Sequence, residues 1–239
     1  MILSKNTVVV TGGAGRFANE LKKTKSKYKM IFPSKKKMDI LKISTINTYL
    51  KSKKPQYLLH LAGLSRPMKL HDTSIKSSID LNIIGTCNIT KVCSDLGIKL
   101  IYFSTSYVYP GKKGNYKETD SLLPNNNYAW SKLGGESAVQ MYKNSLILRM
   151  SMTEEPFVHD RAFVDFNTNF IFHRYVVKFL FKLFNKKGII NVGGKIQSVY
   201  NFAKIYNPKI KKAYAKELLG KNYPLNPSMN INKLKKIIK

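Results

Sequence analysis

The stretch VVVTGGAGRFANEL, from Val8 to Leu21, joins a short β-branched run to a helix pattern through a glycine-rich turn. Gly12, Gly15 and Ala18 follow the spacing Gly-x-x-Gly-x-x-Gly/Ala. In such a turn the first glycine permits a sharp change of direction, the second lets the backbone approach a pyrophosphate, and the third small residue lets the helix pack closely. The helix start then offers free N–H groups to the phosphates. The stretch therefore predicts a dinucleotide site in preference to a purely structural turn.

Strand and helix patterns alternate outward from this turn through the first 150 residues. Apolar runs predict strands at 7–11, 28–32, 56–62, 99–105 and 145–150. Helical spacing places these apolar residues on helix faces: Ile46, Tyr49 and Leu50; Ile79, Ile83, Ile84, Cys87 and Val92; Leu133, Ala138, Met141 and Tyr142. Strands joined by helical crossovers predict an α/β fold, a doubly wound parallel sheet covered on both faces.

After residue 150 the pattern changes. An irregular, aromatic-rich segment is followed by a predicted apolar helix over 171–184, a short strand over 188–194 and a helix at the end of the chain. We therefore expect residues 1–150 to form a nucleotide-binding domain and residues 151–239 to form a small C-terminal lobe partly packed on it.

The net charge of +29 over 239 residues would suit a nucleic-acid partner. The positive charge is nearly all lysine, spread along the whole chain, whereas arginine is the usual base-reading side chain. The arginines are Arg16, Arg66, Arg149, Arg161 and Arg174. This composition favours lysine-rich solvated faces, so we expect no nucleic-acid partner.

Three further expectations come from short features of the sequence. The apolar runs are too short to span a membrane, and the start of the chain lacks the features of a secretory signal, so we expect a cytoplasmic protein. Cys87 and Cys93 lie on different faces of one predicted helix, so free buried thiols are expected. The four histidines lack a metal-ligand spacing, so no metal is expected, and His60, within an apolar strand pattern, is expected to be a core residue.

The end of the second predicted strand bears on which dinucleotide binds. NAD sites usually present an acidic residue there, to hold the ribose hydroxyls. Here the sequence is IFPSKKKMD, in which the first acid is Asp39 and the preceding lysines are Lys35, Lys36 and Lys37. These lysines, with Arg16, would suit the 2′-phosphate of NADP(H). NADP(H) is therefore preferred and NAD(H) stays open.

The stretch NNNYAWSKLGGE, residues 125–136, places Tyr128 and Lys132 one helical turn apart. A free tyrosine has a pKa near ~10, and a cation nearby favours its phenolate form. Further stretches occur in the same order and spacing: HLAGLS (60–65), LNIIGTCN (81–88) and FSTSYVYPG (103–111). With the glycine turn, this set resembles the extended short-chain dehydrogenase/reductase family (NAD-dependent epimerase/dehydratase superfamily), and within it the dTDP-4-dehydrorhamnose reductase branch.

The resemblance implies a Rossmann fold with a small C-terminal substrate-binding lobe, and it implies roles for single residues. Tyr128 would transfer a proton at the sugar carbonyl, Lys132 would lower the tyrosine pKa and hold the nicotinamide ribose, and Thr105 would hydrogen-bond the substrate oxygen. Residues expected along the cofactor are Gly12, Gly15, Arg16, Phe17, Asp39, Ile40, Leu61, Ala62, Gly63, Asn82, Ser104, Tyr128 and Lys132. Residues expected at the substrate are Ser65, Ser106, Tyr107, Arg161 and Asn169.

The activity implied is NADP-dependent reduction of a 4-keto nucleotide sugar, for surface polysaccharide synthesis. Epimerisation of a nucleotide sugar on the same fold is an alternative, and so is a non-catalytic NAD(P)-binding subunit or sensor. Dehydratases of the family usually carry an Asp-Glu pair after the catalytic threonine, where this chain has Ser106 and Tyr107. A homodimer is expected through the helix that carries Asn82 and the helix that carries Tyr128.

Overall fold

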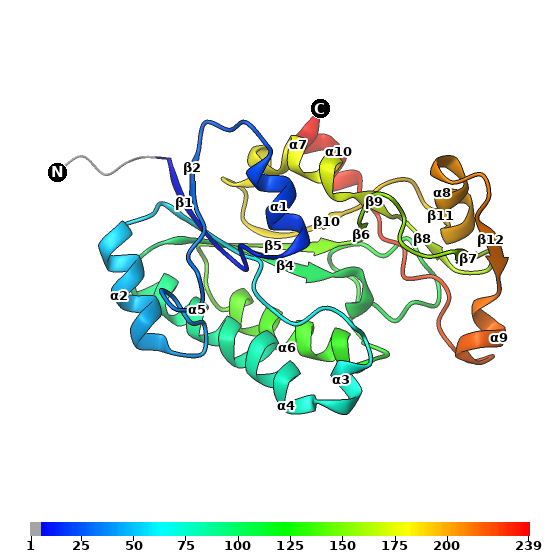
Figure 1. Cartoon of the computed structure of the whole chain (residues 1–239), viewed down its shortest axis with the longest axis horizontal. Coiled ribbons are helices and arrows are strands. Elements are labelled where there is room, and N and C mark those ends of the chain that lie inside the picture. Colours follow the sequence, from blue (N-terminus) through cyan, green and yellow to red (C-terminus); the bar gives the residue numbers. More distant parts are fainter. Residues whose placement is uncertain (1–5) are drawn as a thin grey trace. The chain divides into compact units, whose positions relative to one another are not determined.

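The computed structural model describes residues 6–239, and its central element is a six-stranded sheet in the order β10-β5-β4-β3-β1-β2 (Figure 1). The strands are β1 (Thr7–Thr11), β2 (Lys29–Ile31), β3 (Tyr57–His60), β4 (Lys99–Thr105), β5 (Ser145–Met150) and β10 (Gly188–Val192). β1 pairs in parallel with β2 and β3, and β3 pairs in parallel with β4. The expected α/β fold is confirmed, and each of the five strands that the sequence predicts up to residue 150 is present.

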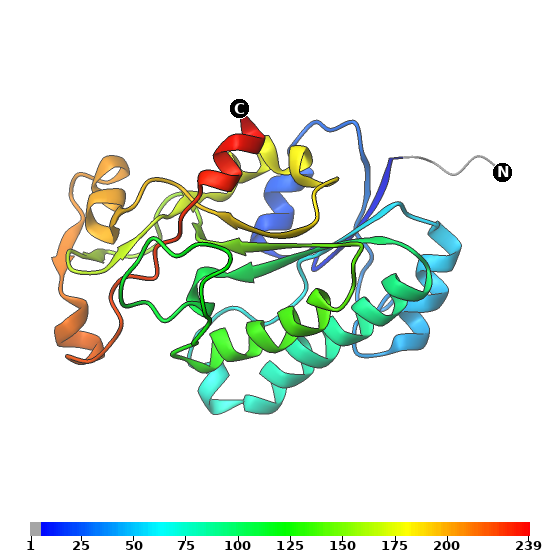
Figure 2. The ribbon, with the colours of Figure 1, turned by 180° about the vertical axis from the view of Figure 1, so that it is seen from behind.

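Helices cover both faces of this sheet. α1 (Arg16–Lys22) lies on one face, while α2 (Ile43–Lys53), α5 (Gly85–Asp95) and α6 (Asn127–Gln140) lie on the other (Figures 1 and 2). α2 contacts α5, and α5 contacts α6. Buried side chains of the strands, α2, α5 and α6 form a shared core, among them Val9, Ile46, Leu50, Leu58, Ile89, Val92, Leu100, Val139 and Ile147. The doubly wound arrangement expected from the sequence is therefore present.

The chain changes direction in the sheet at β1. It passes from β1 to β2 on one side and then to β3 on the other. In open α/β sheets, ligands bind outside the carboxyl ends of the strands at such a switch point. The predicted third strand ends two residues early, at His60, because the N–H groups of Leu61 and Ala62 donate to the Thr11 hydroxyl. The glycine turn and the segment after β3 are thus tied together.

The long helix predicted around residues 79–92 contains a π-helical turn. α4 (Ile75–Ser78), the π turn η1 (Ile79–Ile84) and α5 follow one another directly, and α3 (Leu70–Thr73) precedes them. The predicted apolar face is wrong at Ile79 and Ile84, which are 43% and 45% exposed, whereas Val92 is buried as predicted. In a regular α-helix Ile79 would share a face with Thr86, seven residues on, yet Thr86 is 1% exposed. The wide π turn shifts the helix phase between them.

The two cysteines are free, as expected from the sequence. Cys93 is buried, and burial raises the pKa of its thiol. Cys87 is only half-buried, which corrects the expectation of two buried thiols. The six-residue spacing explains the difference, because it places the two cysteines on different faces of α5.

The described residues divide into two compact units. The first comprises the chain up to Ser104, Asn126–Leu148 and Leu183–Ile189. The second comprises Thr105–Asn125, Arg149–Lys182 and Ile190–Lys239. The sequence led us to expect a single boundary after residue 150, whereas this division groups Thr105–Asn125 with the later segments.

The second unit has short strand pairs and a core of its own. The pairs are β6 (Met152–Thr153) with β9 (Ile171–Phe172), β7 (Arg161–Phe163) with β12 (Lys211–Ala213), and β8 (Asn167–Thr168) with β11 (Gln197–Ser198). Its helical elements are η2 (Ser106–Val108), α7 (His173–Leu183), α8 (Val199–Tyr206), α9 (Ala215–Leu219) and α10 (Asn232–Ile238). Ala162, Phe166, Val199, Ala203, Ile210 and Ala215 pack together in its interior. The predicted apolar helix, strand and terminal helix are all present.

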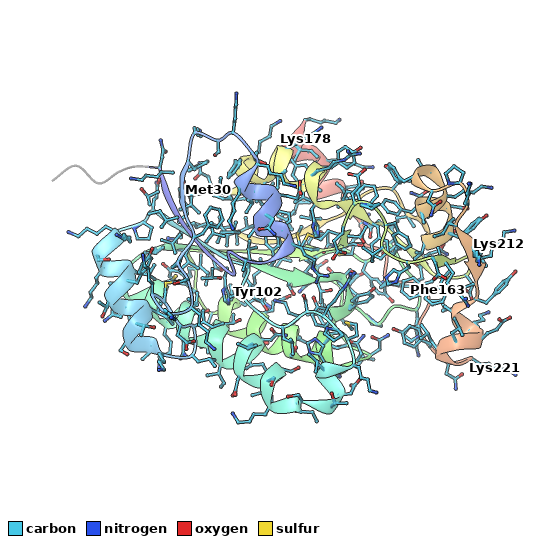
Figure 3. All side chains as sticks on the ribbon, in the orientation of Figure 1. Met30, Tyr102, Phe163, Lys178, Lys212 and Lys221 are labelled. Atoms are coloured by element: carbon cyan, nitrogen blue, oxygen red, sulfur yellow. The ribbon has the colours of Figure 1, made fainter. Side chains whose placement is uncertain are left out.

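Lysines lie mostly on the outside of the protein. Lys178, Lys212 and Lys221 are exposed, and Figure 3 shows them at the outside of the ribbon, in contrast to Tyr102 within it. Lys132 and Lys99, by contrast, are buried. No helix within residues 6–239 is long and apolar enough to cross a membrane.

Candidate active site

The glycine-rich turn after β1 has the geometry that its sequence predicts. Gly12 adopts a φ of +69°, and its carbonyl accepts a 2.9 Å hydrogen bond from the Gly15 N–H. α1 then begins at Arg16, with no side-chain cap and no acidic residue in its first turn. The positive end of α1 therefore directly follows the turn, an arrangement that fits the pyrophosphate of a dinucleotide.

Gly12→Ala is expected to disrupt this turn, because the added Cβ would lie 2.7 Å from the Ala62 backbone nitrogen. We expect NADPH binding to weaken at least ~10-fold and the unfolding free energy to fall by about 2–4 kcal/mol, from strain and overpacking combined. Gly97→Ala is the matched control, since Gly97 has a φ of +67° and no atom within 4 Å of the added Cβ. Thermal unfolding measures the stability of each variant, and fluorescence titration measures its affinity for NADPH. Equal effects of the two substitutions would contradict the expectation.

The Thr11 hydroxyl organises the residues at the end of β3. Its Oγ1 accepts hydrogen bonds of 3.0 Å from the N–H groups of Leu61 and Ala62, and it lies 2.8 Å from His60 Nδ1. Because Oγ1 accepts twice, its own proton points to Nδ1, which assigns the His60 proton to Nε2. Burial, together with the charge of Lys132, lowers the pKa of His60 to about 3. His60 is thus a neutral core residue, as the sequence predicts.

The hydrogen bonds continue from His60 to α6. His60 Nε2 lies 3.1 Å from Thr86 Oγ1. The Thr86 side chain hydrogen-bonds the Tyr102 hydroxyl. That hydroxyl donates a 3.1 Å hydrogen bond to the Lys132 carbonyl. Burial raises the pKa of Tyr102 well above its ordinary value, so its hydroxyl stays a donor. A directional chain of hydrogen bonds therefore joins the carboxyl end of β1 to the helix that carries the predicted catalytic pair.

Asn82, in the π turn, fixes the segment after β3 against α6. Its Oδ1 accepts from the Leu64 N–H at 2.7 Å, and its Nδ2 donates to the Leu64 carbonyl at 2.9 Å and to Ser131 Oγ at 2.8 Å. Ser131 Oγ in turn donates to the Tyr128 carbonyl at 2.8 Å. Asn82 therefore acts through the backbone that it holds, beside Gly63, whose added Cβ would lie 2.7 Å from Oδ1.

Tyr128 and Lys132 lie on the first two turns of α6, as predicted. The Tyr128 ring is half-buried and packs at 5.0 Å, with an interplanar angle of 59°, against the His71 imidazole. The Lys132 ammonium is buried 4.1 Å from the centroid of the Tyr102 ring, a cation–π contact. Burial lowers the pKa of Lys132 to about 7, against the opposing charge of Glu136. The Lys132 side chain can thus change between its ammonium and amine forms near neutral pH.

Two buried polar residues near this pair had no assigned role in the sequence. Glu136, one turn beyond Lys132, is fully buried and accepts a hydrogen bond from the Ser104 hydroxyl. His71 is 1% exposed, its Nδ1 lies 2.6 Å from Ser78 Oγ, and its Nε2 has no hydrogen-bond partner within residues 6–239. Burial lowers the pKa of His71. Ser104, expected along the cofactor, has its hydroxyl engaged by Glu136.

The residues expected near the adenosine are of two kinds, exposed basic side chains and less exposed side chains packed in the fold. Lys35, Lys36 and Lys37 are exposed, and Arg16 Nη2 lies 3.3 Å from Ser65 Oγ at the surface. Asp39 is half-buried, and its carboxylate accepts a hydrogen bond from the Leu41 N–H. Ile40 is buried, and its carbonyl accepts from the Asn88 side chain. Phe17 packs edge-on against Phe103. The lysines after β2 therefore lie at the surface, while the Asp39 carboxylate is held by backbone.

The remaining predicted residues belong to the second unit. Thr105 Oγ1 accepts from the Tyr107 N–H at 3.3 Å, and Ser106 is buried. Arg161 is exposed, 3.9 Å from Asp160. Asn169 is fully buried, with both side-chain polar atoms bonded to the Met229 backbone at 3.2 Å. The geometry of Asn169 favours a structural role, because its amide is already engaged at both atoms.

Within residues 6–239, no group of three or more histidine, cysteine, aspartate or glutamate side chains could hold a metal ion. The site instead combines a strand–turn–helix that fits a dinucleotide with a tyrosine and a buried lysine on one helix. These features define an NAD(P)-binding α/β protein of the short-chain dehydrogenase/reductase type. The chain belongs to the family described as RmlD substrate binding domain, whose model matches residues 6–166.

Curated relatives and solved structures agree with this assignment. Methionine adenosyltransferase 2 subunit beta of Xenopus laevis is 31% identical over 114 residues, 47% of this chain and 34% of that protein. The dTDP-4-dehydrorhamnose reductase of Aggregatibacter actinomycetemcomitans is 25% identical over 190 residues, 77% of this chain and 59% of that protein. The chain thus spans from about a third to three-fifths of these relatives.

The fold is shared with a solved reductase structure. The dTDP-4-dehydrorhamnose reductase of Bacillus anthracis str. Ames, in complex with NADP, superimposes with a TM-score of 0.85 at 21% identity. The match covers 97% of this chain and 92% of that one. The Rossmann-like architecture expected from the sequence is therefore confirmed.

Proposed function

We infer that the protein is an NADPH-dependent reductase of a 4-keto nucleotide sugar. One observation carries the proposal: Lys132 is buried, is held over the Tyr102 ring, and lies one helical turn from Tyr128. A buried lysine is costly to stability, since burial opposes its charge, so its presence beside a tyrosine favours a catalytic role. The relatives named as reductases support the same activity.

In the proposed reaction, the bound dinucleotide supplies the hydride. Tyr128 donates the proton to the sugar carbonyl oxygen, and the charge of Lys132 stabilises the phenolate that remains. The hydrogen bonds from Asn82 to Ser131, and from Ser131 to the Tyr128 carbonyl, hold the start of α6 in place. Thr105 is proposed to hydrogen-bond the substrate oxygen, with Ser65, Ser106, Tyr107 and Arg161 as further substrate contacts.

NADP(H) is the proposed cofactor, and NAD(H) is the second candidate. The exposed Lys35, Lys36 and Lys37 and the guanidinium of Arg16 support this choice, because a 2′-phosphate needs cationic donors. No carboxylate precedes Asp39 after β2 to hold a free 2′-hydroxyl.

The test is to follow NADPH and NADH oxidation by the whole chain with a panel of 4-keto nucleotide sugars. Turnover of one sugar, with product reduced at C4, supports the reductase; an unreduced product of inverted configuration would indicate an epimerase. Absence of turnover across the panel, with both dinucleotides bound, would contradict the proposal.

A cofactor-binding subunit without catalysis is the second candidate, favoured by the 31% identity to a protein named as a subunit. It predicts that NADPH binds but that Tyr128→Phe changes no measurable property. The panel above and that variant together separate the two candidates.

A second copy of the chain is proposed to cover an exposed apolar stripe on the first unit. Ile75, Ile79 and Ile84 are 54%, 43% and 45% exposed along α4 and the π turn, and Trp130 on α6 is 51% exposed. Single exposed apolar residues are common, but a row of them along adjoining helices marks an interaction surface.

Ile84→Lys is therefore expected to convert a dimer to a monomer, because a lysine buried within an apolar interface is costly to desolvate. Light scattering coupled to size-exclusion chromatography measures the mass. Ile205→Lys is the matched control, since Ile205 on α8 is also exposed, at 65%, but lies in the second unit. A monomeric wild-type chain at working concentration would contradict the proposal.

A further inference from the structure

Lys132 lies in surroundings that disfavour its charge. Its side chain is buried, and burial lowers its pKa to about 7. The groups that act on it are His60 from β3, Tyr102 from β4 and Glu136 from α6 itself, and Tyr128 lies one turn earlier on α6. His60 and Tyr102 are neutral, since burial holds their pKa values low and high respectively.

Glu136 is the one carboxylate among these groups, and its placement is specific. It lies four residues after Lys132, so the two side chains share a face of α6. It is fully buried, and its carboxylate accepts from the Ser104 hydroxyl and, at 3.5 Å, from Gln140 Nε2. A buried carboxylate is costly unless it is hydrogen-bonded and matched by a cation. Glu136 has the donors, and Lys132 is the nearby cation.

We propose that Glu136 is a positioning residue which, with Ser104 and the face of the Tyr102 ring, keeps the Lys132 ammonium charged and in place inside the fold. The ring offers its negative face to the ammonium at 4.1 Å, and the Tyr102 hydroxyl is anchored on the Lys132 carbonyl. Ser104 fixes the carboxylate that opposes the discharge of the ammonium. The partnership of Lys132 with Tyr128 rests on the proposed function, whereas the charge of Lys132 can be measured without it.

The decisive experiment is an NMR pH titration of the whole chain labelled at the lysine Cε. One resonance should titrate near pH 7 and disappear in Lys132→Met, which assigns it. In Glu136→Gln its midpoint should fall by about one to three pH units, because an opposite charge has been removed. Lys99 is an internal reference, since burial lowers its pKa to about 8 and its charged neighbour is Lys187; its midpoint should not move.

Two further variants keep the proposal open to refutation. Ser104→Ala leaves the carboxylate but removes its donor, so the Lys132 midpoint should lie between those of wild type and Glu136→Gln. Glu217→Gln removes an exposed carboxylate and should change nothing. An unmoved Lys132 midpoint in folded Glu136→Gln overturns the proposal; where that variant does not fold, an unmoved midpoint in Ser104→Ala does so. An equal shift in Glu217→Gln also overturns it.

Catalysis gives a second readout. Activity should fall as pH rises through the Lys132 midpoint, and Glu136→Gln should move that alkaline limb to lower pH with little change in KM. A chain that reduces no sugar but shows the NMR shift would contradict the proposed function alone, so the two failures are distinguishable.

Discussion

Tyr128→Phe is expected to lower kcat by about 10²- to 10⁴-fold, the range that proton transfer by a positioned side chain contributes. The substitution removes the hydroxyl alone. The ring contact with His71 and the hydrogen bond from Ser131 to the Tyr128 carbonyl do not need that hydroxyl, so the fold and NADPH binding should be kept. Stopped-flow or steady-state NADPH oxidation measures the rate, and fluorescence titration measures the binding.

Tyr142→Phe is the matched control for that result. Tyr142 also donates its hydroxyl within the first unit, to the carbonyls of Cys93 and Ile98 at 3.1 and 3.0 Å. Its removal should reduce stability by about 1 kcal/mol and leave kcat unchanged. Equal rates for Tyr128→Phe and wild type would refute the assignment of Tyr128 as the proton donor.

Lys132→Met is expected to abolish activity, because it removes the charge that stabilises the Tyr128 phenolate, and to change how the unfolding free energy depends on pH. The pKa of Lys132 is about 7 in the folded chain, below the ordinary value of 10.5. Unfolding therefore takes up a proton between these values, and the contribution to stability is present above 10.5 and lost as pH falls toward 7. The variant should lose this slope between pH 7 and 10.5.

Urea unfolding at several pH values measures the slope. Lys99→Met is the matched control, since Lys99 is a second buried lysine, with its pKa lowered to about 8 by burial and by Lys187. It should flatten the slope between pH 8 and 10.5 while activity is kept. A Lys132→Met chain that keeps the wild-type slope between pH 7 and 10.5 would contradict the expectation.

The elements of the sheet could be predicted because local signals agreed with one another. The β-branched run 7–11, the turn at Gly12 and the start of α1 each follow from residue type, and the structure confirms all three. His60 was predicted to be buried from its place in an apolar run, and it is. The catalytic roles of Tyr128 and Lys132 stay predictions that the experiments above address.

The π turn and the buried polar residues could not be predicted in the same way. A periodicity of 3.6 assumes a constant helix, so it assigned Ile79 to the buried face on which Thr86 lies instead. Glu136 had a signal in the sequence, at the same four-residue spacing that joins Tyr128 to Lys132. Its burial and its bond to Ser104, 32 positions away, depend on tertiary structure that spacing does not report.

The π turn also links the loop after β3 with the exposed isoleucines on the outside of the helix. The extra residue in that turn rotates Asn82 inward, toward Leu64 and Ser131, and leaves Ile79 and Ile84 outward. Removing one residue would restore a regular helix, since each residue of an α-helix turns by about 100°. It would then withdraw the isoleucines from the surface and Asn82 from the loop together. A change in the length of this turn is therefore expected to alter the loop after β3 and the exposure of the isoleucines at once.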